Sequence, residues 1–211
     1  AFQKAVEYLA SSQRLRLSAG GFSYNLAKGR VEIDNLELSS TVNPDLPPLF
    51  TASRVEVGIG IIPLFSGDIL LPGIVVRDAK ASVVFTEDGR DNLPKSDSPG
   101  GGPPPRLMIG NATIAPLQVR YEDRKNNIVF DSPQWEASMR GSAPDWRHKI
   151  LLASKTPGEI RMEGRTLSFE QIDLSAEMPL AGDIENVELV TKLGDSTLNV
   201  TGDPLGDRPE L

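Results

Sequence analysis

The sequence predicts an all-β protein: an elongated, curved antiparallel sheet that forms an open apolar groove, behind a short N-terminal amphipathic helix. Three observations support this fold class. Apolar and polar residues alternate along most of the 211-residue chain. Turn-forming residues are frequent, with 19 Gly and 17 Pro. One strand pattern, which contains a slip of a single residue, occurs four times. The alternative fold is a closed β-sandwich, which the same alternation would also produce.

The helix is predicted over residues 1–12. Phe2, Val6 and Leu9 lie on one face of a helix in AFQKAVEYLASSQ, which gives an apolar stripe on a short segment. No other stretch of the chain has a convincing helical period.

Strands are predicted wherever the period is two and turn residues flank the segment. Their ranges are 14–18, 50–62, 79–85, 116–123, 149–154 and 197–201, in addition to the four slipped segments below.

Residues 94–105, PKSDSPGGGPPP, are predicted to form a flexible loop. Proline lacks the backbone donor that a sheet needs, and consecutive glycines lose much conformational entropy when they are ordered. Because the same kind of strand resumes after this loop, residues 1–211 are interpreted as one β-groove segment of a longer protein.

The slipped pattern has two apolar residues in alternation, two further positions, and then two more alternating apolar residues. The first copy, GRVEIDNLEL, slips at Asp34-Asn35; the others slip at Pro72-Gly73, Gly110-Asn111 and Glu170-Gln171. The copies begin at residues 31, 69, 107 and 167, so the spacings are 38, 38 and 60. A slip of one residue turns later side chains to the other face unless a bulge or bend absorbs it.

Bends repeated from strand to strand would curl the sheet into a trough lined by aliphatic side chains. About 12 to 14 strands, each adding about 4.8 Å, would make a trough on the order of 60 Å long. An apolar face of that size has to be covered by another layer or by an apolar ligand. The residues predicted to line it are Val31, Ile33, Leu36, Leu38, Val55, Val57, Ile59, Ile69, Leu71, Ile74, Val76, Val83, Phe85, Leu107, Ile109, Ile114, Leu167, Phe169, Ile172 and Leu174.

Composition disfavours several classes of function. The chain has no cysteine, which excludes disulfides and thiolate zinc sites. Its net charge is −7, and no basic patch interleaved with aromatic residues suggests a nucleic-acid partner. His148 is the single histidine, so a catalytic triad would lack supported partners. The segment EDGRDN at 87–92 lacks the spacing of a calcium loop and is interpreted as a turn. We therefore expect no enzyme, no metal and no cofactor.

Residues 1 to about 125 resemble the AsmA/TamB family of Gram-negative envelope proteins. A short amphipathic helix leads into RLRLSAGGFSYNLAKGRVEIDNLEL, similar to the start of that family's periplasmic region. A strand of aliphatic residues follows, and then the element Gly89-Arg90-Asp91-Asn92-Leu93, which is similar to the family's x-G-x-x-N-L. A Pro/Gly loop and a new strand pair, PGGGPPPRLMIGNATIAPLQVRYEDRKNN, come next. Beyond residue 130 only the general β pattern is shared.

The resemblance implies a periplasmic groove (a β-taco) tethered to the inner membrane of a Gram-negative-type bacterium by an anchor outside this segment. It implies phospholipid acyl chains as the ligand, shielded during transport between the inner and outer membranes. Some relatives act in outer-membrane protein assembly, so assembly proteins are the second partner that the resemblance implies.

Three functions therefore stay open from the sequence. The first is a groove for acyl chains, and the second is a scaffold that pairs with client strands at a free sheet edge. The third is a plain structural β-sandwich module. Lipid that copurifies with the chain would distinguish the first from the other two.

Overall fold

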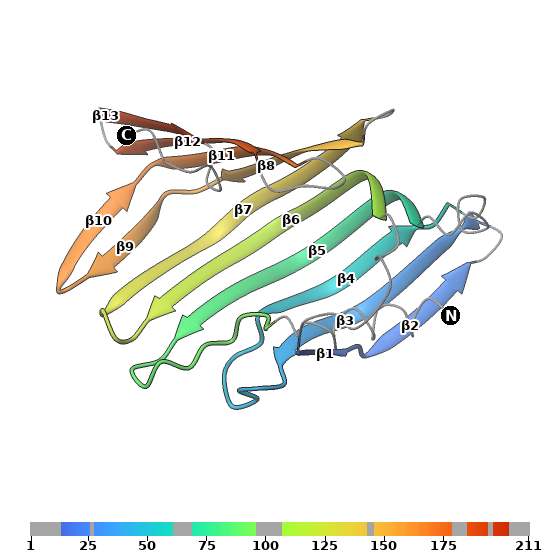
Figure 1. The fold of residues 1–211 in the computed structure, drawn as a ribbon, viewed down its shortest axis with the longest axis horizontal. Coiled ribbons are helices and arrows are strands. Elements are labelled where there is room, and N and C mark those ends of the chain that lie inside the picture. The colour runs from blue at the N-terminus through green and yellow to red at the C-terminus, as the bar shows by residue number, and fades with distance from the viewer. Residues whose placement is uncertain are drawn as a thin grey trace.

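The computed structural model describes residues 14–25, 28–60, 69–95, 107–142, 146–178, 185–193 and 196–202. Within these ranges the chain forms one sheet of 13 strands (Figure 1). The strands are β1 (Leu15–Ser18), β2 (Gly21–Asn25), β3 (Arg30–Ser40), β4 (Phe50–Gly58), β5 (Ile69–Phe85), β6 (Leu107–Asp123), β7 (Ile128–Ser142), β8 (Arg147–Ser154), β9 (Gly158–Met162), β10 (Arg165–Phe169), β11 (Gln171–Met178), β12 (Glu185–Leu193) and β13 (Ser196–Gly202).

The order of strands across the sheet is β1-β3-β4-β5-β6-β7-β8-β11-β12-β13. The strand β2 also pairs with β3, β9 pairs with β7, and β10 pairs with β9. The sheet is curved and its two ends do not meet, as the sequence of colours in Figure 1 shows. The prediction of an all-β, curved, open sheet is confirmed, and the alternative of a closed β-sandwich is wrong.

One pair of strands corrects the prediction of an antiparallel sheet. β5 and β6, the two longest strands, run parallel, with Ile69 opposite Leu107 and Phe85 opposite Asp123. All the other strand pairs within the described ranges are antiparallel. Parallel neighbours need a long crossover connection, and residues 86–106 provide its length. Alternation within a strand carries no information about the direction of its neighbour, so the sequence did not predict this pair.

Two predicted elements lie wholly or mostly outside the described residues: the helix at 1–12 and the loop at 94–105. Several predicted strands are parts of longer ones. The slipped segment that begins at Ile69 continues through residues 79–85 as β5, and the one that begins at Leu107 continues through 116–123 as β6.

The segment that follows β5 is fixed by Asn92, whose side chain is 0% exposed. Its Oδ1 accepts a hydrogen bond from the backbone N–H of Val84 at 3.0 Å, and its Nδ2 donates to Ser82 O at 2.7 Å. Nδ2 also donates to Pro47 O at 3.0 Å. β4 begins at Phe50, which is opposite Ala81 in β5. The part of β5 that follows Ala81 therefore has no neighbouring strand on the β4 side. The amide of Asn92 takes the place of such a strand and satisfies buried backbone groups.

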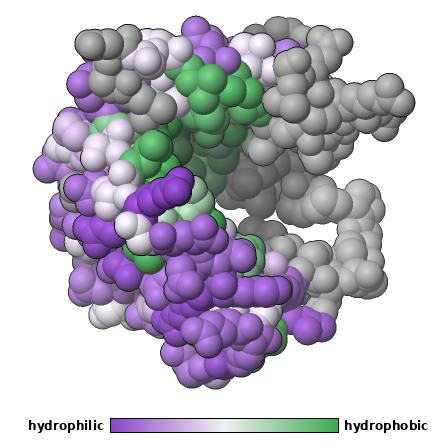
Figure 2. Space-filling view, turned by 90° about the vertical axis from the view of Figure 1, so that its left-hand side faces the viewer, coloured by the Kyte–Doolittle hydropathy of each residue, from purple (hydrophilic) through white to green (hydrophobic). Residues whose placement is uncertain are grey.

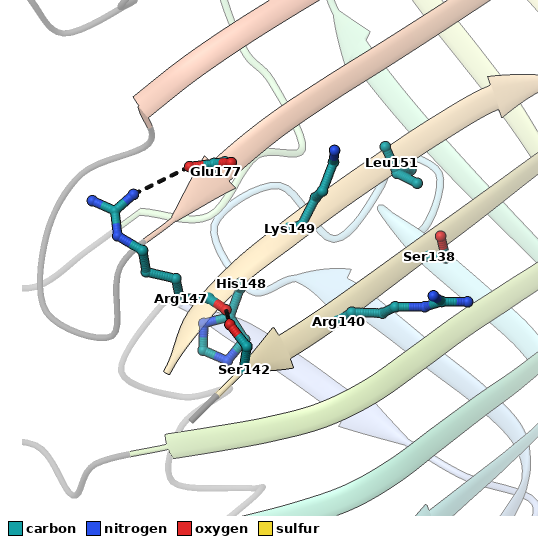
Figure 3. Close-up of a pocket in the computed structure, with 8 residues that line it drawn as sticks. All are labelled: Ser138, Arg140, Ser142, Arg147, His148, Lys149, Leu151 and Glu177. Atoms are coloured by element: carbon teal, nitrogen blue, oxygen red, sulfur yellow. Dashed lines mark hydrogen bonds and ion pairs between the residues drawn. The ribbon is translucent and has the colours of Figure 1, made fainter. Parts of the chain in front are cut away.

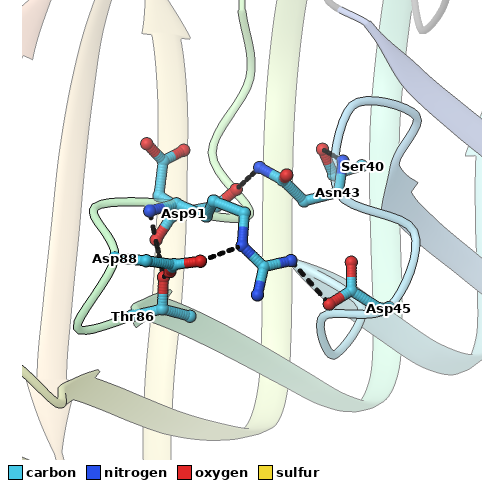
Figure 4. A network of polar contacts seen from close by, with 7 residues as sticks. Ser40, Asn43, Asp45, Thr86, Asp88 and Asp91 are labelled. Atoms are coloured by element: carbon cyan, nitrogen blue, oxygen red, sulfur yellow. Dashed lines mark hydrogen bonds and ion pairs between the residues drawn. The ribbon is translucent and has the colours of Figure 1, made fainter.

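Arg90 holds this segment to the loop between β3 and β4 by binding Asp88 and Asp45, both of which are labelled in Figure 4. Its Nη1 lies 2.7 Å from Asp45 Oδ2, and its Nε lies 2.7 Å from Asp88 Oδ2. Asn43 Nδ2 donates to Asp91 O at 2.8 Å, which adds a second link between the same loops. Hydrogen bonds from Thr86 and Arg90 lower the pKa of Asp88 from 3.8 to about 2. The element Gly89–Leu93 is thus a structural clasp at the end of β5.

Replacing Asn92 by Ala is expected to lower the free energy of unfolding by about 2 to 3 kcal/mol, because it leaves buried backbone groups without partners. Urea unfolding measures this loss. Asn199→Ala in β13 is the matched control: its side chain is exposed, and the expected change is within about 0.5 kcal/mol. Equal losses in the two variants would contradict the role given to Asn92.

The pKa of Asp88 can be followed through its carboxyl carbon by NMR during an acid titration. Because its folded pKa of about 2 lies below the ordinary value of 3.8, the ionised group stabilises the fold above pH 3.8. That contribution is lost as the pH falls through about 2. Thr86→Val and Arg90→Ala should each raise the pKa of Asp88, whereas Arg161→Ala, which removes an ion pair in β9, should leave it unchanged. An unchanged pKa in both of the first two variants would disprove the assignment.

Candidate functional site

One face of the sheet carries a continuous cluster of apolar side chains, and we call this face the inner face. In Figure 2 hydrophobic residues gather in the interior of the molecule, while hydrophilic residues cover the surface to their left. Burial removes these side chains from water and provides the main favourable free energy for packing the sheet. The buried members of the cluster are Val31, Ile33, Leu36, Ala52, Val55, Val57, Leu71, Val76, Ala79, Leu117 and Trp135.

The inner face stays apolar because neighbouring strands slip at the same rung. Asn35 in β3 has a φ of 50°. It lies beside Ser53 in β4, because the residue pairs before and after these two have the same register. Ser53 is level with Asp78 in β5, which has a φ of 48°, and Asp78 is level with Pro116 in β6. The Oγ of Ser53 donates to Asp78 Oδ2 at 2.8 Å across this line. Every strand from β3 to β6 therefore bends together: the pairing is interrupted at this rung, and the register is the same on both sides of it.

A second line of slips crosses β5 and β6 at Pro72-Gly73 and Gly110-Asn111. The two sites are directly opposite in the parallel pair. At Gly110 an added Cβ would lie 2.7 Å from Pro72 O, so only a glycine allows the two backbones to approach this closely. The 38-residue spacing of the second and third copies in the sequence is thus the register offset between β5 and β6.

The inner face continues to the C-terminal edge of the sheet. Leu152 is opposite Leu174, Leu174 is opposite Leu189, and Leu189 is opposite Val200, so one row of aliphatic residues spans β8, β11, β12 and β13. Exposure rises along the sheet: Val31 in β3 is 3% exposed, whereas Val200 in β13 is 41% exposed. The side chains of the inner face are thus buried in β3 and exposed to solvent in β13.

The opposite face, which we call the outer face, carries charged residues in matched rows. Glu56 in β4 lies between Arg30 in β3, at 3.5 Å, and Arg77 in β5, at 3.6 Å. Two residues before Glu56 in β4, Arg54 Nε lies 2.9 Å from Asp34 Oδ1 in β3. These exposed ion pairs contribute little stability individually. Their placement keeps the outer face wet, so apolar ligands have one face of the sheet available.

The structure brings together many of the residues predicted to line the groove. Seven lie in the buried cluster and four more pack against it; in chain order these are Val31, Ile33, Leu36, Val55, Val57, Ile59, Leu71, Ile74, Val76, Ile114 and Ile172. Leu38 is half-buried and is opposite Phe50, which also packs against the cluster. The half-buried residues Val83, Phe85, Ile109 and Leu174 lie beside the cluster without belonging to it. The side chains of Ile69 and Leu107 lie outside what the structure describes.

The fourth copy of the slipped pattern is divided between two strands. Phe169 ends β10 and Gln171 begins β11, so the slip at Glu170-Gln171 is a change of strand. Leu167 is exposed. Phe169 is buried against Phe130, with ring centroids 5.6 Å apart. The shared letter pattern thus has a different structural origin here, because a break and a bulge both shift the alternation by one.

Several members of the inner face were missed by the sequence reasoning. Ala52, Ala79 and Leu117 are buried in the cluster next to slips at residues 53–54, 77–78 and 115–116. The signal that could have found them is the same slipped pattern with alanine counted as an apolar residue. Trp135 and Val200 lie outside the four copies of the slipped pattern.

Carboxylates and the single histidine, His148, are the side chains from which a metal or acid–base site would be built. Among the described residues, no three His, Asp or Glu side chains are grouped so as to hold a metal ion. His148 is 2% exposed, and its Nε2 accepts a hydrogen bond from the N–H of Ile109 at 3.4 Å. In the part of the chain that the structure covers, no helix is long and apolar enough to span a membrane. Comparisons with protein-family models and with curated proteins find no match for the chain.

Asn35 provides a test of the bend on which the inner face depends. Asn35→Val is expected to lower the free energy of unfolding by about 1 to 2 kcal/mol, because a β-branched residue is strained at a φ of 50°. Asn35→Gly should stay within about 1 kcal/mol of the parent, since glycine adopts this φ freely. Urea unfolding compares the two variants at one position. Equal stabilities would show that the strand passes this rung without the bend.

Proposed function

We propose that the inner face binds the acyl chains of phospholipids and shields them from water. The observation that supports this most strongly is the unbroken apolar inner face, which runs from β3 to β13 and opens to solvent at the C-terminal edge. An acyl chain needs a continuous aliphatic surface with few polar interruptions, and the hydrophobic free energy of its burial grows with the apolar area covered.

The chemistry of the two faces favours a lipid over a small polar ligand. The inner face is mainly Val, Ile, Leu and Ala, with few aromatic rings and no ion pair among its described members. The outer face has rows of ion pairs that stay hydrated. A lipid can lie with its acyl chains on the first surface while its headgroup remains in water at the ends of the strands.

The wider setting is also a proposal, and it follows from the resemblance of residues 1 to about 125 to AsmA/TamB proteins. We place the chain in the periplasm of a Gram-negative-type bacterium, tethered to the inner membrane. It would be one section of a longer bridge that carries phospholipid to the outer membrane. A parallel pair with an offset of 38 residues is a unit that further strands could extend.

A photocrosslinking amino acid at Ile74 tests lipid binding directly. Ile74 packs against the buried cluster of the inner face, whereas its neighbour Val75 is exposed on the outer face. In cells of a Gram-negative host, the probe at Ile74 should capture phospholipid at least about tenfold more than the probe at Val75, as expected if acyl chains contact one face only. Mass spectrometry of the crosslinked protein identifies the adduct.

The matched pair removes the main ambiguity. Both positions are aliphatic, adjacent in β5 and at nearly the same distance from the strand ends, so general contact with membranes would label them alike. Equal labelling, or no lipid adduct at Ile74, would refute the proposal.

The free edge of β13 favours a second function, pairing with a client strand. β13 ends the strand order of the described sheet, and all seven of its residues are exposed. Unpaired backbone groups at such an edge can add a strand from another chain. Crosslinks from Thr197 or Asn199 to outer-membrane protein strands, without lipid adducts at Ile74, would support assembly in place of lipid transport.

A further inference from the structure

A basic pocket lies on the outer face where β7 ends and β8 begins (Figure 3). Its volume is about 570 Å³. Arg140 and Lys149 are directly opposite each other in the antiparallel pair of β7 and β8, so their side chains leave the sheet on the same side. Both residues are exposed, and neither forms an ion pair with any other part of the described chain. The pocket thus places two cations side by side, and Glu177 in β11 lies directly opposite Lys149 on its other side.

Like charges that face each other across a strand pair are destabilising. Elsewhere on the outer face, arginines have carboxylate partners, as Arg54 has in Asp34. Among the described residues, the acidic residue that lines the pocket is Glu177, which is opposite Lys149 and whose Oε2 already binds Arg147 Nη1 at 3.1 Å. Three cations, Arg140, Arg147 and Lys149, thus share one carboxylate, and this local excess of positive charge favours an anion from outside.

Neutral polar side chains also line the pocket. Ser138 and Ser142 line the pocket from β7, on the same face as Arg140. Ser142 Oγ already donates to Arg147 O at 3.4 Å. His148 lies between Arg147 and Lys149 in β8, so its ring leaves the sheet on the inner side and its buried Nδ1 does not face these charges.

We propose that this pocket binds a phosphate group. The guanidinium of Arg140 offers a planar pair of donors that matches two phosphate oxygens, and Lys149 adds a point charge. The hydroxyl of Ser138, which lines the pocket, supplies a further hydrogen bond. This inference goes beyond the proposed function, because the pocket lies on the outer face and its affinity for phosphate does not depend on acyl chains on the inner face.

The phosphate belongs either to a lipid headgroup or to a free anion, and two probes separate these sources. Inorganic phosphate is titrated into the isotope-labelled chain, and the backbone amides of residues 138–142 and 147–151 are followed by NMR. In parallel, the chain is floated with vesicles of phosphatidylcholine that contain phosphatidylglycerol, and with vesicles of phosphatidylcholine alone.

Arg140→Ala combined with Lys149→Ala should weaken binding by at least about tenfold, since two charge-assisted interactions are removed. The matched control is Lys80→Ala with Arg165→Ala, which removes the same charge from two exposed residues of β5 and β10. Arg140→Lys should keep part of the affinity, because the charge stays and the planar fork is lost. Urea unfolding checks that the double variant is folded.

Each outcome decides the proposal. Site-specific shifts with inorganic phosphate, lost in the double variant only, support a free phosphate anion as the ligand. Flotation with the phosphatidylglycerol vesicles, lost in the double variant only, supports a lipid headgroup. If neither probe binds, or if the double variant and its control behave alike with both probes, the pocket does not bind phosphate.

Discussion

Backbone pairing is the constraint on which the rest of this sheet depends. A ladder of hydrogen bonds keeps neighbouring strands in a fixed register, and side chains alternate between the faces with a period of two. A strand that slips by one residue would therefore turn its apolar side chains outward. Asn35, Ser53, Asp78 and Pro116 occur at one rung, so four strands slip together and the inner face stays intact.

The parallel pair of β5 and β6 shows how a repeated sequence pattern becomes a structural unit. Two slipped segments with a spacing of 38 residues lie side by side, and each bend in one strand meets a bend in the other. Near the connection from β5 to its parallel neighbour β6, part of the other edge of β5 has no neighbouring strand. Asn92 satisfies that edge with its side-chain amide, and Arg90 ties the same segment to the loop before β4. The clasp and the parallel pair are thus two parts of one arrangement.

The two faces of the sheet divide the chemistry of the molecule. Aliphatic side chains on the inner face gain free energy by leaving water, and charged side chains on the outer face retain their hydration. Burial on the inner face falls from β3 towards β13, which leaves apolar surface accessible at the edge where the described sheet ends. The basic pocket near the end of β7 belongs to the outer face, close to the strand ends.

The sequence by itself determined the local properties: the strands, the slip at Asp34-Asn35, and the absence of thiol chemistry. It also pointed to Gly89–Leu93 as a distinct element and to about half of the inner-face residues, because alternation and turn residues act over a few positions. Only the tertiary structure decided which strands are neighbours, that β5 and β6 run parallel, and that Arg140 faces Lys149. These are contacts between residues distant in the chain. The hydrogen bonds that fix them are formed by backbone groups that are the same in nearly every residue, so side-chain patterns do not encode them.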